Sequence, residues 1–117
     1  MRYLLDEDTP HSLRDQLLRR APDLEVLAVG DAMGPALGTP DPQLLRWIER
    51  EGYALVSRNR RTMPRHLQDH LEAGGHVPGI FLLRRQYTIG RILDDLLLIW
   101  EVGDVEEYRD RLEYLPL

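Results

Sequence analysis

Carboxylates at two places in the sequence could together form a metal site. Asp6, Glu7 and Asp8 are consecutive and directly follow the apolar residues Tyr3–Leu5, and Asp41 comes after a loop much later in the chain. Carboxylates held close together repel one another unless a cation joins them. A cluster of Asp6, Asp8 and Asp41 would offer the oxygen ligands that Mg²⁺ or Mn²⁺ prefers. Such an ion could activate water or hold a phosphodiester.

Each of these acids also has a structural alternative. Asp6 could form a turn at the end of a strand, and Glu7 and Asp8 could be solvated or interact with the positive end of a following helix. Asp41 could be a helix N-cap, a role compatible with binding a metal through water. Because a carboxylate at a sheet edge needs a partner, we take Asp6 and Asp41 as candidate catalytic residues. Asp6, Asp8 and Asp41 are the candidate metal ligands.

A basic run later in the chain could bind substrate. Arg58, Asn59, Arg60 and Arg61 follow an apolar segment, and the guanidinium group suits bidentate contacts to phosphate. The alternative is that these arginines pair with the acids. All 15 basic residues are arginine and none is lysine, a bias that genomic base composition explains more simply than phosphate binding. We predict that Arg58, Asn59, Arg60 and Arg61 bind substrate.

Two histidines provide a weaker candidate site. His66 and His70 stand one helical turn apart, a spacing that could hold zinc. No glutamate follows His66 in the manner of a metalloprotease, and no third ligand is evident. The pattern therefore favours a solvent-facing amphipathic helix.

The elements that must position these residues alternate between strand and helix. Short apolar runs predict strands, and three–four apolar spacing predicts helices, with Thr9, Asp41, Thr88 and Asp104 as N-caps and Gly52 as a stop. The loop 30–40 is long for a compact connection, which indicates mobility or function. The predicted strands are 3–5, 24–29, 53–57 and 79–83, and the predicted helices are 9–20, 41–52, 63–74, 88–100 and a short one from 104 through 112.

Strands separated by helices imply a mostly parallel sheet with helices on both faces. The predicted fold class is therefore α/β, a three-layer sandwich with about four strands, on which Leu4, Val26, Val56 and Leu82 are neighbours. Residues that directly follow parallel strands meet at one edge of the sheet. We expect the carboxylates of Asp6 and Asp41 to lie there within reach of a bridging water.

Composition sets further limits. The 117 residues suit one domain spanning 1–117, and a net charge of -5 argues against a general nucleic-acid coat, although a local basic patch remains compatible with it. The absence of cysteine excludes disulfides and thiolate metal sites. No apolar run approaches the roughly 18 residues of a membrane span. We expect a cytoplasmic protein without a membrane partner.

Four segments together resemble a known family. They are Leu4-Leu5-Asp6-Glu7-Asp8, Thr39-Pro40-Asp41, Leu55-Val56-Ser57-Arg58-Asn59 and Leu112-Glu113-Tyr114-Leu115-Pro116, and they are similar to the small stand-alone PIN-like domain proteins of bacteria. That family is related to PIN-domain nucleases, which bind Mg²⁺ or Mn²⁺ through acidic residues and cut RNA, and many members are predicted toxins of toxin–antitoxin pairs. The resemblance implies a PIN-like fold, with RNA and an antitoxin protein as partners. It gives Asp6 the place of the first metal-site aspartate and Asp41 that of the acid at the second helix.

The sequence departs from the family pattern at one place. The family usually has an aspartate at the exit of the third strand, often with another two residues later, whereas this chain has Asn59 and Arg61. The loss of two negative charges should weaken binding of a divalent ion. Two functions follow: a metal-dependent ribonuclease of PIN-like type acting through Asp6 and Asp41, or a catalytically reduced PIN-like module that binds RNA or a protein partner. The oligomeric state stays open, with a homodimer as one expectation.

Overall fold

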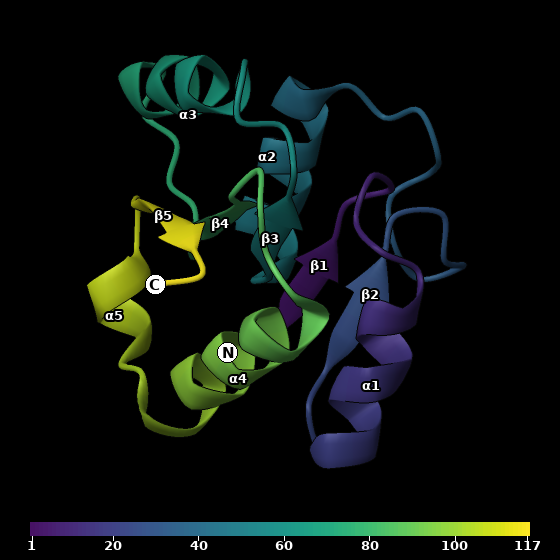
Figure 1. The fold of residues 1–117 in the computed structure, drawn as a ribbon. Helices are drawn as coiled ribbons and strands as arrows, with labels where there is room; N and C mark the ends of the chain where they lie inside the picture. Colours follow the sequence, from purple (N-terminus) through teal and green to yellow (C-terminus); the bar gives the residue numbers. More distant parts are fainter.

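The computed structural model describes residues 1–117 as five strands that alternate with helices (Figure 1). All five strands belong to one parallel sheet with the order β2-β1-β3-β4-β5. The strands are β1 (Tyr3–Leu5), β2 (Val26–Ala28), β3 (Ala54–Ser57), β4 (Ile80–Leu83) and β5 (Leu112–Leu115). The helices are α1 (Ser12–Arg20), α2 (Asp41–Glu51), α3 (Met63–Glu72), α4 (Ile89–Val102) and α5 (Val105–Tyr108).

The central strands are buried at every position because both faces of the sheet are covered. Each residue of β1, β3 and β4 is buried, as expected for parallel strands between helices. Leu4, Val26, Val56 and Leu82 lie on four neighbouring strands, so this prediction is confirmed. The α/β class with a parallel sheet is confirmed as well.

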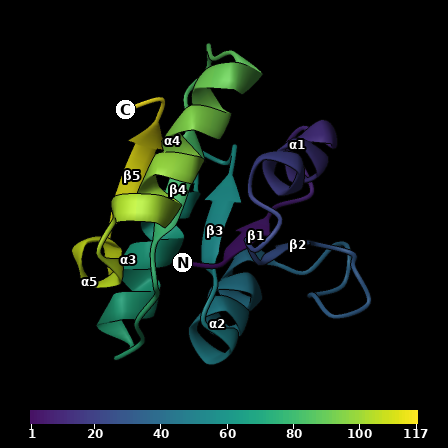
Figure 2. The ribbon, with the colours of Figure 1, turned by 90° about the horizontal axis from the view of Figure 1, so that it is seen from below.

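Alternate residues of each strand belong to two separate cores. Tyr3 and Leu5 face one core together with apolar residues of α1 and α4, whereas Leu4 faces a second core with residues of α2 and α3. Figures 1 and 2 accordingly show α1 and α4 on one side of the sheet and α2 and α3 on the other. The result is three layers, helix, sheet and helix. No helix is both long enough and apolar enough to cross a membrane.

The C-terminal segment differs from the sequence prediction. The predicted helix from Asp104 through Leu112 ends at Tyr108, and Leu112 instead begins a fifth strand. Asp110 has a left-handed φ of 62°, which stops a helix, and its backbone N–H and carboxylate bind Val77. This pairing with the segment before β4 turns the chain into the sheet, so the sheet has five strands rather than about four.

Two of the predicted N-caps are wrong and two are correct. The hydroxyl of Thr88 accepts a hydrogen bond from Arg91 N, and the carboxylate of Asp104 accepts one from Glu106 N. Thr9 instead donates its hydroxyl to the carbonyl of Asp6, so α1 begins later, at Ser12. Asp41 is the first residue of α2 and makes no capping bond, which leaves its carboxylate available to other donors.

A buried hydroxyl ties the sheet to α4 and provides a first test of the packing. Tyr3 is fully buried and donates its hydroxyl to Leu96 O at 2.7 Å. We expect Tyr3→Phe to lower the free energy of unfolding by about 1 kcal/mol, because it leaves a buried acceptor without this donor. Urea unfolding of Tyr3→Phe and of the control Tyr53→Phe measures the difference, since the hydroxyl of Tyr53 makes no hydrogen bond. Equal changes in both variants would contradict the assigned role of this bond.

Candidate functional site

The carboxyl edge of the sheet gathers most of the predicted site residues. Asp6 and Asp8 follow β1, Asn59 follows β3, and Asp41 begins α2. In the sheet order β1 and β3 are neighbours, so their exits are adjacent. A short chain of hydrogen bonds runs from Asp6 through Ser57 and Asn59 to Asp41.

Asp6 is a buried carboxylate without a cationic partner. It is 8% exposed, and its two oxygens accept hydrogen bonds from Ser57 Oγ at 2.9 Å and from Glu7 N at 2.8 Å. Burial, with a smaller contribution from the charges of Asp8 and Asp41, raises the pKa of Asp6 to about 6 against the lowering effect of the two hydrogen bonds. The group is therefore ionised at neutral pH at a substantial free-energy penalty.

Asn59 acts mainly as a hydrogen-bond donor. Its Nδ2 lies 2.6 Å from Asp41 Oδ2 and 2.7 Å from Thr62 Oγ1, and its backbone N–H donates to Ser57 Oγ at 3.0 Å. The amide oxygen accepts a hydrogen bond from Thr62 N at 3.3 Å. Asn59 stands at the position where the resemblance expects an acid, and its amide group instead donates a hydrogen bond to the carboxylate of Asp41.

The three candidate metal ligands do not form a preassembled site. No group of three or more His, Cys, Asp or Glu side chains has an arrangement suited to a metal ion. Asp41 is engaged by Asn59, and Asp8 Oδ1 accepts a hydrogen bond from Arg58 N at 3.2 Å. Glu7 is turned toward the 30–40 loop, where it accepts a hydrogen bond from Gly38 N at 3.1 Å. The donor set as folded does not fit a resident Mg²⁺ or Mn²⁺.

The arginines after β3 do not pair with these acids. Arg60 Nη1 donates to the carbonyl of Leu83 at the end of β4 at 2.6 Å, and Arg58 Nη1 reaches the backbone carbonyl of Asp8 at 3.5 Å. Arg61 is exposed and makes no hydrogen bond. The positive charges of all three arginines therefore remain without a carboxylate partner, and the ion-pair alternative is not realised.

No protein-family model, curated protein sequence or solved structure matches this chain. We therefore base the functional assignment on the chemistry of the carboxyl edge.

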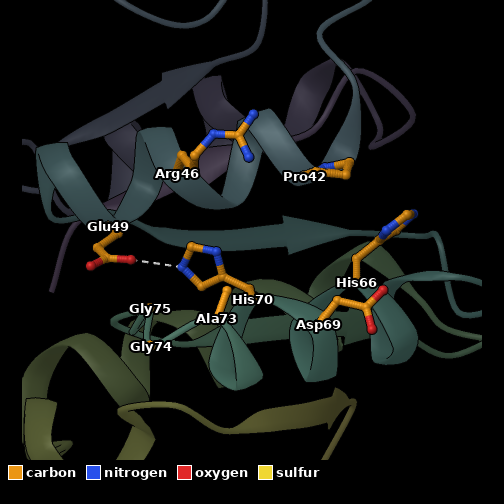
Figure 3. Close-up of a pocket in the computed structure, with 9 residues that line it drawn as sticks. All are labelled: Pro42, Arg46, Glu49, His66, Asp69, His70, Ala73, Gly74 and Gly75. Atoms are coloured by element: carbon orange, nitrogen blue, oxygen red, sulfur yellow. Dashed lines mark hydrogen bonds and ion pairs between the residues drawn. The ribbon is translucent and has the colours of Figure 1, made fainter.

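Sequence reasoning did not place His66 at this edge. Its Nε2 lies 3.8 Å from Asp41 Oδ2, and its side chain is 29% exposed. The available signal was its position in the first turn of α3, because a helix that follows β3 must begin at the carboxyl edge. His70, one turn later, instead contacts Glu49 Oε1 at 2.7 Å. Figure 3 shows the two imidazoles pointing in different directions, so they do not form a zinc pair.

Two hollows flank the site. A groove of about 390 Å³ lies between α2 and α3 and contains Arg46, His66 and His70 (Figure 3). It is closed at one end by Glu49, whose pKa is lowered by a hydrogen bond from the His76 backbone N–H and by His70. A second hollow of about 290 Å³ lies on the α1 side of Asp6 and is lined by Asp6, Glu7 and His11, among others. Of the two, only the second is lined by Asp6.

Proposed function

We propose that this chain is a catalytically reduced PIN-like module that binds RNA at the carboxyl edge of its sheet. The observation that carries the proposal is the set of charges after β3. Arg58, Arg60 and Arg61 lie at the edge where open α/β sheets bind their ligands, and no carboxylate neutralises them. Phosphate oxygens are matching acceptors for guanidinium groups.

The reduced character rests on Asn59. A divalent ion binds through acceptors, whereas the Asn59 amide donates to Asp41 and to Thr62. The hydrogen bond at 2.6 Å to Asp41 uses one carboxylate oxygen that a metal would need. A site arranged in this way supports binding of a phosphodiester better than its cleavage.

A second candidate, a metal-dependent ribonuclease of PIN-like type, is favoured by one specific observation. Asp6 is buried with a raised pKa and has no cation beside it, while Asp8 and Asp41 add negative charge. These three acids would be the residues that hold Mg²⁺ or Mn²⁺ after rearrangement, and a bound ion would supply Lewis-acid activation of water. As the toxin of a toxin–antitoxin pair, such an enzyme would also bind an antitoxin protein.

Loss of charge after β3 tests the proposed RNA binding. We expect the double variant Arg58→Ala/Arg61→Ala to bind a labelled single-stranded RNA about tenfold more weakly than wild type, because two phosphate contacts are removed. Fluorescence anisotropy in EDTA measures affinity without cleavage. Arg19→Ala/Arg111→Ala is the matched control, since Arg19 lies in the last turn of α1 and Arg111 precedes β5, both at the opposite edge. Equal losses in the two double variants would contradict the proposal, as would wild-type protein that binds no RNA.

Calorimetry with Mn²⁺ separates the two candidates. The reduced module predicts no Mn²⁺ binding at millimolar concentration by either wild type or Asp6→Asn. Binding by wild type that is lost in Asp6→Asn, together with Mn²⁺-dependent RNA cleavage, would instead establish the ribonuclease.

A further inference from the structure

The arginines of this protein divide into two groups. Six of the 15 form ion pairs with carboxylates, namely Arg2, Arg14, Arg20, Arg50, Arg65 and Arg109. Of the nine that do not, six follow strands β3 and β4 or lie in the first turn of α4: Arg58, Arg60, Arg61, Arg84, Arg85 and Arg91. We call these six residues the arginine surface.

The two chain segments that carry the arginine surface contain no acids of their own. Residues 57–68 and 73–93 contain no aspartate or glutamate, although the whole chain has a net charge of -5. These two segments supply the exits of β3 and β4 and the start of α4. In Figure 2 the arrowheads of β3 and β5 point toward the end of the molecule at which α4 begins, so the segments meet on one side. The positive charge of these two segments is therefore not offset by acids within the segments themselves.

Backbone carbonyls hold Arg60 and Arg84 by hydrogen bonds without neutralising their charge. Arg60 Nη1 donates to Leu83 O at 2.6 Å, next to Arg84 in the chain, and Arg84 Nε donates to Pro116 O at 2.8 Å. Arg91 Nη2 donates to Leu117 O at 3.4 Å. A guanidinium group has five N–H donors, so each of these side chains is held by one and keeps others for a ligand. Of the two aspartates of α4, Asp94 forms an ion pair with Arg20, and Asp95 is buried and accepts a hydrogen bond from Leu117 N.

An exposed aromatic ring borders this surface on β5. Tyr114 is 38% exposed, and the guanidinium carbon of Arg84 lies 5.6 Å from the centre of its ring. Proteins that bind single-stranded nucleic acid combine basic side chains along the backbone with aromatic rings on which bases stack. Tyr114 therefore provides an aromatic ring for base stacking next to the basic side chain of Arg84.

We propose that single-stranded RNA continues from the β3 exit over Arg84, Arg85 and Arg91 to Tyr114, which extends the RNA site of the proposed function across β4 to β5. This inference rests on the proposed function. The exits of β3 and β5 are two strand spacings apart, roughly 10 Å. That span suits a few successive phosphates of one strand, whereas a duplex presents two backbones and shields its bases from stacking.

The test again uses anisotropy in EDTA, with a labelled single-stranded oligouridine as the probe. We expect Arg85→Ala/Arg91→Ala to lower its affinity about tenfold, and to reduce the slope of log K against log salt by about 1.4 for two lost phosphate contacts. The control Arg19→Ala/Arg111→Ala removes the same charge from the opposite edge and should change affinity by less than twofold. Tyr114→Ala should weaken binding about fivefold, and Tyr114→Phe, which keeps the ring, should not.

Each outcome has one meaning. If Arg58→Ala/Arg61→Ala weakens binding but Arg85→Ala/Arg91→Ala matches the control, the extension over β4 is wrong and the proposed function stands. If wild type binds a duplex of equal length more tightly than the single strand, the assigned ligand is wrong. If wild type binds neither RNA, both the extension and the proposed function are overturned.

Discussion

Asp6→Asn is expected to stabilise the protein at pH 7 while removing its candidate catalytic acid. Burial raises the pKa of Asp6 from 3.8 to about 6, so keeping this side chain ionised in the folded state costs about 3 kcal/mol as an upper limit. Asparagine is neutral and nearly isosteric, and its oxygen can still accept one of the two present hydrogen bonds. We expect the free energy of unfolding to rise by about 2 kcal/mol and the melting temperature by on the order of 5–10 °C.

The stabilisation by Asp6→Asn should depend on pH in a direction that the raised pKa of Asp6 determines. Because the folded pKa of Asp6 exceeds the unfolded value, the native state binds more protons between pH 4 and about 6, and Asp6 makes the protein less stable as pH rises through this window. The advantage of Asp6→Asn should therefore be complete above pH 6 and disappear below pH 4. The quantity to compare is the free energy of unfolding of the variant minus that of wild type at each pH. Wild type alone does not isolate Asp6, because hydrogen bonds and ion pairs lower the pKa of Glu49, and this makes the protein more stable as pH rises.

A matched variant controls for the loss of one negative charge. Asp23 is exposed, makes no hydrogen bond and undergoes the same chemical change in Asp23→Asn. Urea unfolding at pH 4 and pH 7 should show less than 0.5 kcal/mol for this control. A destabilised Asp6→Asn protein at pH 7 would show that the Ser57 and Glu7 hydrogen bonds outweigh the burial of charge.

Asn59→Asp is expected to have the second-largest effect, in the opposite direction. The substitution places a second carboxylate against Asp41, where Nδ2 of Asn59 now lies 2.6 Å from Oδ2, and also removes the donor to Thr62. Repulsion and two lost hydrogen bonds should lower the free energy of unfolding by about 2 kcal/mol without metal. His66, 3.8 Å from Asp41, offsets part of this loss when it is protonated.

Mn²⁺ then tests whether Asn59 weakens a metal site at this edge. An ion that binds only the native state adds about 2.7 kcal/mol when its concentration is one hundred times its Kd. If the edge is a weakened metal site, millimolar Mn²⁺ should restore the melting temperature of Asn59→Asp and leave Asn59→Ser unchanged, since serine lacks the charge. The same shift in both variants would indicate binding elsewhere, and no shift in either would leave the RNA-binding module as the better assignment.

The sequence predicted the sheet well where burial on both faces left a clear signal. Tyr3–Leu5 and Ile80–Leu83 are uninterrupted apolar runs, and such runs between amphipathic helices have few alternative arrangements. The fifth strand escaped prediction because Glu113 and Tyr114 interrupt its apolar character. The spacing of Val105, Tyr108 and Leu112 also fits a helix, and only the tertiary contact of Asp110 with Val77 ends that helix early.

The candidate site was predictable as a location but not as a set of contacts. Strand exits of a parallel sheet must meet at one edge, which places Asp6 and Asn59 together from topology alone. Which group donates to which depends on side-chain directions that no spacing encodes. The hydrogen bond of Ser57 to Asp6 joins the ends of the paired strands β3 and β1, whereas the hydrogen bond of Asn59 to Asp41 and the approach of His66 to Asp41 depend on the packing of α3 beside α2.

The strand order also determines when the site can form during folding. β1 pairs with β3 as well as with β2, and the hydrogen bond between Ser57 and Asp6 joins residues 51 positions apart. Such a pairing closes a long loop of chain before it gains contacts, which places it among the slower steps of folding. Asp6, Asp8 and Asp41 all lie within the first 41 residues. A nascent chain that ends before β3 therefore contains these acids but cannot yet bring them together at the sheet edge. Ligand binding at this edge therefore indicates that β1 and β3, at the centre of the sheet, have paired.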